Sequence, residues 1–310
     1  MSRVLVTPRS ITKAGGHPSL DRLTAAGYEV RFSAPGKLPA QEELQDLLQG
    51  CAGYLAGVEP VTEELLGGLP ELRVISRNGT GVDSIDLQAA ERHGVRVCRA
   101  KAANAQGVAE LTIGMLFALA RSIPAHDAGL KGSAWERHAG VELHDRTLGV
   151  VGCGAIGQRV TRMALGVGMK VQAYDVQQDP GFAPGASFTY ASLDAVFASS
   201  DFVTLHCPPP KGCALVTAAV LSGMPKGAYL INTARAGLVD EAAILAALDN
   251  GQLAGYATDV FAEEPPHDWT LCQHPRIIAT PHVGGYTSES VDRSMEVAVD
   301  NLLTHLEKTQ

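Results

Sequence analysis

The sequence is poor in aromatic residues, in charge and in long apolar runs. Of its 310 residues, 5% are aromatic and 19% are charged, whereas 45% are hydrophobic and 33 residues are glycine. This composition argues against a disordered chain and allows a substantial core. Frequent glycine suits an α/β protein with many tight turns between strands and helices. At this length, one large domain or two domains of ordinary size are expected.

Features of nucleic-acid-binding, membrane and secreted proteins are also missing. The net charge is −8 and no basic run stands out, so nucleic acid is not expected as a partner. The longest apolar stretch, residues 111–120, is about half a membrane span, and no membrane partner is expected. Residues 1–8 hold too short an apolar run for a signal peptide. We therefore expect a cytoplasmic protein.

The six cysteines show neither a disulfide framework nor a metal-binding pattern. They form no Cys-x-x-Cys pair, and no Cys/His cluster has zinc-finger spacing. In a chain this long they are expected to be reduced residues of a core or cleft. No metal site is predicted.

Short apolar runs alternate with helical patterns in two parts of the chain, which predicts two parallel sheets. In the first part we expect strands at Arg3–Thr7, Glu29–Phe32, Gly53–Ala56, Arg73–Ser76 and Val95–Cys98, and helices at Ser19–Ala26, Gln41–Leu48, Thr62–Leu66 and Asp86–His93. In the second part we expect strands at Thr147–Val151, Val171–Tyr174, Phe202–His206, Tyr229–Asn232, Gly255–Asp259 and Ile277–Thr280, and helices at Ile156–Leu165, Leu193–Ala198, Leu215–Met224 and Asp240–Asn250. A last helix is expected at Ser288–Glu307. A long apolar helix, about Asn104–Ser122, is expected at the boundary.

A glycine fingerprint, Gly152-x-Gly154-x-x-Gly157, follows the first strand of the second part and opens a helix. Such glycines permit a tight turn and a close approach to a pyrophosphate, which the helix N-terminus also attracts. Asp175 ends the next strand, where an acid binds ribose hydroxyls and disfavours a 2′-phosphate, so NAD is predicted rather than NADP. Taken alone, the pattern also fits a glycine-rich turn with Asp175 as a helix cap.

Three successive strands of the second part are followed by Arg235, by Glu264 and by His282. Ligands of an open parallel sheet lie at the carboxyl ends of its strands. An arginine there can hold a carboxylate, and a histidine beside an acid suits a general acid for carbonyl reduction. The alternatives are a surface arginine paired with Asp240 or Glu241, and a structural histidine.

These motifs resemble the D-isomer-specific 2-hydroxyacid dehydrogenase family, most of all its phosphoglycerate-dehydrogenase-type members. Beside the glycine fingerprint they are Asn-Thr-Ala-Arg-Ala-Gly-Leu-Val-Asp at 232–240, Asp-Val-Phe-Ala-Glu-Glu-Pro at 259–265 and Thr-Pro-His-Val-Gly-Gly at 280–285. The resemblance runs from about Leu72 to Gly285 and more weakly through the N-terminal strands. It implies an NAD-dependent enzyme that transfers hydride reversibly between nicotinamide and C2 of a small anionic D-2-hydroxy acid, with 3-phosphoglycerate among the candidate substrates.

The resemblance also implies residue roles. Arg235 would anchor the substrate carboxylate, and Glu264 would pair with His282, the proton donor and acceptor. The cofactor would be bound by Gly152, Gly154, Ala155, Ile156, Gly157, Asp175, His206, Cys207, Thr233, Ala234, Asp259, His282, Gly284 and Thr80. The substrate would be bound by Arg77, Asn78, Gly79, Thr80 and Gly81 together with Arg235. Within this loop, Arg77 would hold a second anionic group, or is simply a solvated arginine.

Two residues depart from the family pattern. Ala236 stands where glycine is usual, after the catalytic arginine, and Ala155 stands where a basic residue is common. The second departure removes one contact to the pyrophosphate.

The fold implied is a pair of doubly wound parallel-sheet domains. A Rossmann cofactor domain, residues 101–284, would be inserted into a flavodoxin-like substrate domain, residues 1–100 plus 285–310. A homodimer through the boundary helix is also implied. The alternative functions are a glyoxylate or hydroxypyruvate reductase, a phosphite dehydrogenase, and a non-catalytic NAD(H)-sensing protein of the co-repressor kind. Formate enzymes are disfavoured because they carry glutamine where this chain has Glu264.

Overall fold

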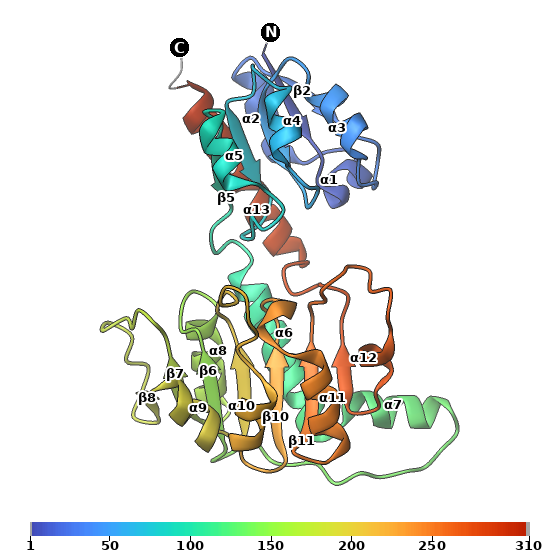
Figure 1. Ribbon diagram of the computed structural model, residues 1–310, viewed down its shortest axis with the longest axis vertical. Helices are drawn as coiled ribbons and strands as arrows, with labels where there is room; N and C mark the ends of the chain where they lie inside the picture. The colour runs from blue at the N-terminus through green and yellow to red at the C-terminus, as the bar shows by residue number, and fades with distance from the viewer. Residues whose placement is uncertain (1, 308–310) are drawn as a thin grey trace. The chain divides into compact units, whose positions relative to one another are not determined.

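The computed structural model describes residues 2–307 and divides the chain into two compact units, each with a sheet of its own. Unit 1 is Met1–Asn104 with Ser288–Gln310, and unit 2 is Ala105–Thr287. The blue and red ends of the colour scale both belong to unit 1 in Figure 1, so unit 2 is inserted into it in chain order. The divisions fall at 104/105 and 287/288, where the sequence predicted 100/101 and 284/285.

Unit 1 is built on a five-stranded parallel sheet in the order β2-β1-β3-β4-β5. Its strands are β1 Arg3–Val6, β2 Glu29–Phe32, β3 Cys51–Ala56, β4 Val74–Arg77 and β5 Arg96–Arg99. This is the flavodoxin-like order, and the strand order reverses between β1 and β3. The predicted doubly wound sheet of the first domain is confirmed.

Helices cover both faces of the unit 1 sheet. They are α1 Arg9–Ala14, the 3₁₀ helix η1 Pro18–Leu20, α2 Asp21–Ala25, α3 Gln41–Leu48, α4 Glu63–Gly67, α5 Leu87–Arg92 and α13 Ser288–Glu307. Side-chain caps fix two of the starts, since Thr62 accepts from the Leu65 N–H and Asp86 from the Ala89 N–H. One face of the sheet packs against α3, α4 and α5, and the other packs against α2 and α13.

Unit 2 is built on a seven-stranded parallel sheet in the order β12-β11-β10-β9-β6-β7-β8. Its strands are β6 Thr147–Val151, β7 Lys170–Tyr174, β8 Phe188–Tyr190, β9 Phe202–Leu205, β10 Ala228–Asn232, β11 Leu253–Thr258 and β12 Ile277–Ala279. The order reverses between β6 and β9, which is the topology of dinucleotide-binding sheets. The predicted Rossmann architecture is confirmed, and β8 is a strand that the sequence did not indicate.

The helices of unit 2 also lie on both faces of its sheet. They are α6 Ala105–Arg121, α7 Ile123–Lys131, α8 Gly157–Gly166, α9 Leu193–Ser199, α10 Ala218–Gly223, the 3₁₀ helix η2 Ala236–Leu238, α11 Glu241–Asp249 and α12 Thr270–Gln273. One core cluster lies under α6 and α8, and the other under α9, α10 and α11.

One expected helix of unit 2 begins later than predicted. The sequence pattern placed it at Leu215–Met224, but α10 starts at Ala218. Val216 instead forms a parallel bridge with Val239, and Thr217 caps the helix by accepting from the Val220 N–H. The apolar residues before Thr217 therefore belong to an extended segment.

Among residues 2–307, no single helix is long and apolar enough to cross a membrane. Only α6 and α7 taken together meet that requirement by length and composition, and they are bent by 66°.

Candidate active site

The glycine fingerprint forms the turn between β6 and α8, and its three glycines have different surroundings. Gly152 has φ +95°, and a Cβ there would lie 2.6 Å from the carbonyl carbon of His206. A Cβ on Gly157 would lie 2.1 Å from the Gly152 oxygen. A Cβ on Gly154 would meet nothing within 4 Å. The outer glycines are thus required by packing, whereas Gly154 faces open space at the start of a helix, where phosphates bind.

Asp175 is held beside this turn by backbone hydrogen bonds. Its Oδ2 accepts from the Cys153 N–H at 2.7 Å, and its Oδ1 accepts from the Gln177 N–H at 2.9 Å. Residues 176–187 contain no helix, so Asp175 is not a helix cap. Its position after β7, next to the glycine turn, is that of the ribose-binding acid in dinucleotide-binding sheets.

His206 presents an unpaired nitrogen beside the same turn. Its Nε2 lies 3.0 Å from the Thr204 hydroxyl, while Nδ1 is buried and has no hydrogen-bond partner among residues 2–307. Burial lowers the pKa of His206 to about 3, so the ring is neutral at physiological pH. A buried nitrogen without a partner and an open glycine at a helix start together fit a bound dinucleotide.

Other predicted cofactor residues have structural contacts of their own. The Thr233 hydroxyl lies 2.9 Å from that of Thr112 on α6, and both side chains are buried. Ile156, Cys207 and Ala234 are partly buried and pack against the two cores of unit 2. These contacts fix the edge of the sheet at which a cofactor would lie.

Glu264 and His282 form a hydrogen-bonded pair. The His282 Nδ1 donates to the carboxylate, at 2.8 Å from Oε1 and 2.7 Å from Oε2. The hydrogen bond to Glu264 raises the pKa of His282 above its ordinary value, against the lowering effects of burial and of Arg235. Burial acts to raise the pKa of Glu264, but the hydrogen bond from His282 and the charges of His282 and Arg235 lower it overall. Both shifts favour a protonated imidazole beside an ionised carboxylate, the pairing that a general acid requires.

The turn that carries His282 is held by Asp259, a buried residue after β11. Its carboxylate accepts from the Thr280 hydroxyl at 2.5 Å and from the Val283 and Gly284 N–H groups at 2.8 Å each. His282 itself has φ +53°, a left-handed conformation that needs such support. The predicted contact of Asp259 with the nicotinamide stays a prediction.

Arg235 follows β10, and the turn around it is fixed by Asn232. The Asn232 side chain accepts from the Ala234 N–H at 3.1 Å and donates to the Arg235 carbonyl at 2.8 Å. The Arg235 guanidinium donates to the Ala234 carbonyl at 2.7 Å, and its charge reaches both Glu264 and His282. Since β10, β11 and β12 are neighbours, the structure brings the three predicted catalytic residues to one edge of the sheet. Asp240, named above as a possible partner of Arg235, caps α11 by accepting from the Ala243 N–H.

The loop predicted to bind substrate follows β4 in unit 1. The Arg77 guanidinium donates to the Asn78 carbonyl, and Gly79 has φ +146°. The one proton of the Thr80 hydroxyl faces two acceptors, the Ala100 carbonyl at 3.2 Å and the Asn104 side-chain oxygen at 3.1 Å. These bonds give the loop a defined shape, and its part in substrate binding stays a prediction.

Two groups of polar residues were not found from the sequence. Arg159 on α8 donates to the Ala155 carbonyl at 2.6 Å, so a cation reaches the glycine turn although Ala155 is not basic. The sequence feature that could have revealed Arg159 is its spacing of four residues from Ala155, which places both residues on one face of a helix. The other group contains Thr7 and Glu59, which lie just beyond strands of unit 1. Their positions in the sequence could have indicated them, because ligands of parallel sheets bind at the carboxyl ends of the strands.

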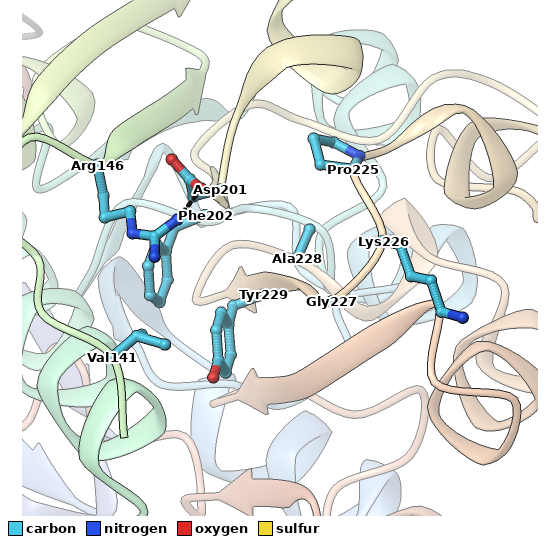
Figure 2. Close-up of a pocket in the computed structure, with 9 residues that line it drawn as sticks. All are labelled: Val141, Arg146, Asp201, Phe202, Pro225, Lys226, Gly227, Ala228 and Tyr229. Atoms are coloured by element: carbon cyan, nitrogen blue, oxygen red, sulfur yellow. Dashed lines mark hydrogen bonds and ion pairs between the residues drawn. The ribbon is translucent and has the colours of Figure 1, made fainter. Parts of the chain in front are cut away.

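A pocket of about 230 Å³ in unit 2 lies away from all these residues. It is formed at the amino ends of β6, β9 and β10, where Arg146 pairs with Asp201 at 2.9 Å and Phe202 stacks on Tyr229 (Figure 2). Because none of the predicted site residues line it, we assign it no part in the chemistry.

Comparison with known proteins bears on this arrangement. Residues 113–284, more than half of the chain, match the family model for the NAD binding domain of D-isomer specific 2-hydroxyacid dehydrogenases. The chain is 40% identical over 265 residues to D-3-phosphoglycerate dehydrogenase of Rattus norvegicus, covering 84% of this chain and 50% of that protein. It spans about half the length of the curated relatives that it matches.

The fold of this chain matches those of solved protein structures over almost its whole length. The TT0316 protein of Thermus thermophilus is 34% identical, with a TM-score of 0.89 over 99% of this chain and 97% of that one. D-lactate dehydrogenase of Aquifex aeolicus, solved with NAD and lactic acid, is 29% identical, with a TM-score of 0.84 over 98% and 96%. The chain therefore belongs to the D-isomer specific 2-hydroxyacid dehydrogenase family.

Proposed function

We propose that this protein interconverts a D-2-hydroxy acid and the corresponding 2-keto acid with NAD(H) as the hydride carrier. The observation that carries the proposal is the His282–Glu264 pair beside Arg235, at the sheet edge that also holds the glycine turn. The family membership and the named activities of the relatives support it. In the direction of reduction, a 2-keto acid, NADH and one proton give a 2-hydroxy acid and NAD⁺.

The protein's own groups supply the proton and the binding of the acid. The nicotinamide, when bound, gives up or accepts the hydride. His282 donates its proton to the carbonyl oxygen at C2, and Glu264 keeps the imidazole protonated and oriented. Arg235 holds the substrate carboxylate and polarises the carbonyl. In the direction of oxidation, neutral His282 accepts the proton of the C2 hydroxyl.

NAD rather than NADP is the proposed cofactor. Asp175 would accept hydrogen bonds from the adenosine ribose, and its charge would repel a 2′-phosphate. Gly154 and the start of α8 would hold the pyrophosphate, and His206 would offer its unpaired Nδ1 to the cofactor.

The substrate loop and the oligomeric state belong to the same proposal. The backbone N–H groups of residues 77–81 would contribute to binding of the substrate carboxylate, as turns rich in glycine do for anions. We further propose a homodimer through the region of α6 and α7. Ile123, Leu130 and Trp135 in and after α7 are 52%, 59% and 83% exposed in the single chain, an apolar exposure typical of an interface.

The test is NADH oxidation against glyoxylate, pyruvate, hydroxypyruvate and phosphohydroxypyruvate, for the native protein and for His282→Ala. We expect turnover of at least one acid, and a loss of roughly 10²–10⁴ in kcat for the variant, the usual contribution of a general acid. A variant that kept most of its kcat would contradict the role of His282. NADH binding without turnover of any 2-keto acid would contradict the proposed reaction.

A further inference from the structure

Unit 1 contains a buried carboxylate that the proposed reaction does not use. Glu59 is 1% exposed and follows β3. Its Oε1 accepts hydrogen bonds from the Thr7 hydroxyl, from the Tyr54 hydroxyl and from the Gly57 N–H, the last at 3.0 Å. Thr7 follows β1 and Gly57 follows β3, so the carboxylate lies at the carboxyl end of the sheet where the strand order reverses. Ligands of doubly wound sheets bind at such a point.

The second oxygen of this carboxylate has no partner. Glu59 Oε2 is buried and makes no hydrogen bond among residues 2–307. It lies so close to Gly57 that a Cβ there would be 2.5 Å away, so only glycine allows this placement. Burial of an acid with one oxygen unsatisfied is unfavourable for stability, and a role in packing would be filled better by an apolar side chain. The three groups around Oε1 all donate to it, which is the arrangement that a carboxylate, an acceptor only, requires.

The buried charge is close to the loop proposed to bind substrate. The Ala56 carbonyl accepts from the Asn78 N–H at 2.9 Å, and the next residue, Gly57, donates to Glu59. Two hydrogen bonds and one peptide unit therefore connect the carboxylate with the start of that loop. The Asn78 side-chain oxygen is also buried and has no hydrogen-bond partner among the described residues, so two buried acceptors in this part of unit 1 are unsatisfied.

We propose that Glu59 is a specificity-determining residue that directs the reaction toward unphosphorylated 2-keto acids. The inference rests on the proposed function and narrows its substrate class. A phosphoryl group adds nearly two negative charges and further acceptor oxygens. In surroundings with an effective dielectric constant of about 20, like charges repel over several ångströms, so the charge that a phosphoryl group adds is disfavoured by about tenfold or more in affinity. The buried carboxylate acts through its field and touches no substrate atom.

The test compares two acids that differ only in the phosphoryl group, hydroxypyruvate and phosphohydroxypyruvate. The ratio of their kcat/KM values is measured for the native protein, for Glu59→Gln and for Tyr54→Phe. We expect the native protein to prefer hydroxypyruvate and Glu59→Gln to shift the ratio toward the phosphorylated acid by about tenfold. Tyr54→Phe removes one donor from the same cluster but keeps the charge, so its ratio should remain native.

Several outcomes overturn the inference while leaving the proposed reaction intact. The first is that the native protein prefers phosphohydroxypyruvate. The second is that Glu59→Gln binds NADH with native affinity but leaves the ratio of the two kcat/KM values unchanged. The third is that Tyr54→Phe shifts this ratio as much as Glu59→Gln does. Should Glu59→Gln fail to fold, the native protein is tested with D-glycerate and 3-phospho-D-glycerate, and preference for the phosphorylated acid again overturns the inference. Absence of turnover with every 2-keto acid would instead remove the proposed function, and this inference with it.

Discussion

At the scale of single residues, the Glu264–His282 pair sets the pH range of the proposed reaction. The hydrogen bond to Glu264 raises the pKa of His282, so the protonated form needed for reduction persists to a higher pH than for an isolated histidine. Reduction should be present below this raised pKa and be lost as the pH rises through it. Oxidation needs the neutral imidazole, so its rate should rise as the pH increases through the pKa of His282.

In Glu264→Gln, the loss of reduction activity with rising pH should occur at lower pH than in the native protein, because a neutral amide no longer stabilises the imidazolium. The measurement is the pH profile of kcat for reduction in the native and variant proteins. Asp268→Asn serves as a control, since Asp268 is an exposed acid of the same loop that bonds only to Thr270 in the described structure. A profile that is identical in Glu264→Gln and the native protein would contradict the assignment.

The glycine turn offers a matched pair of substitutions. Gly154→Ala places its methyl group in open space, so stability should change by under about 1 kcal/mol, while NADH should bind about tenfold more weakly. Gly157→Ala forces a carbon against the Gly152 oxygen and should destabilise the fold outright. Thermal unfolding and NADH fluorescence titration separate the two effects. Native NADH affinity in Gly154→Ala would show that the cofactor does not approach this glycine.

At the scale of elements, α13 completes unit 1 from the far end of the sequence. Its residues Met295, Val299 and Leu302 are fully buried in the core that also holds Val4 and Val6 of β1. Leu302→Ala should therefore lower stability by about 2–5 kcal/mol. Urea unfolding followed by circular dichroism measures this loss. Glu296→Ala on the exposed face of α13 should stay within about 0.5 kcal/mol of native, and equal losses in both variants would contradict this account.

Most elements could be predicted from the sequence, and the misses have physical causes. The strands at β6, β9 and β10 are buried apolar runs, and α6 and α13 are long enough to show helical periodicity. β8 is only Phe-Thr-Tyr, without the continuous apolar run of the equally short β12, and the four residues of α12 are too few for a helical period to appear. No residue of α7 is buried, so that helix has no apolar stripe to reveal it.

The same contrast holds for the candidate site. Arg235, Glu264 and His282 lie in motifs that can be read from the sequence, and the structure brings them to one edge. Glu59 lies in no motif, and its meaning depends on Thr7 and Tyr54, which reach it only through the fold. Likewise, the role of Asp259 in holding the turn of His282 depends on backbone N–H groups whose directions a sequence does not give.

At the scale of the whole molecule, the proposed dimer predicts the mass in solution. The 32.5-kDa chain should sediment and scatter light as a particle of twice that mass. Leu130→Glu in α7 should yield the single chain, because a charge in an apolar interface is strongly unfavourable. Leu38→Glu is the control, since Leu38 is an exposed leucine of unit 1, at 47%. A native protein of single-chain mass would contradict the dimer.

The insertion of one unit into the other has a consequence for biosynthesis. A ribosome delivers the strands of unit 1 first, but α13, which covers one face of their sheet, is made only after the whole of Ala105–Thr287 has been translated. Until then the apolar side chains of Val4, Val6 and Leu55 lack the part of their cover that α13 provides. Unit 2 is a continuous segment, so it can reach its native state while unit 1 still lacks α13. We therefore expect unit 1 to be completed after unit 2, and its early strands to expose apolar surface on the nascent chain for longer.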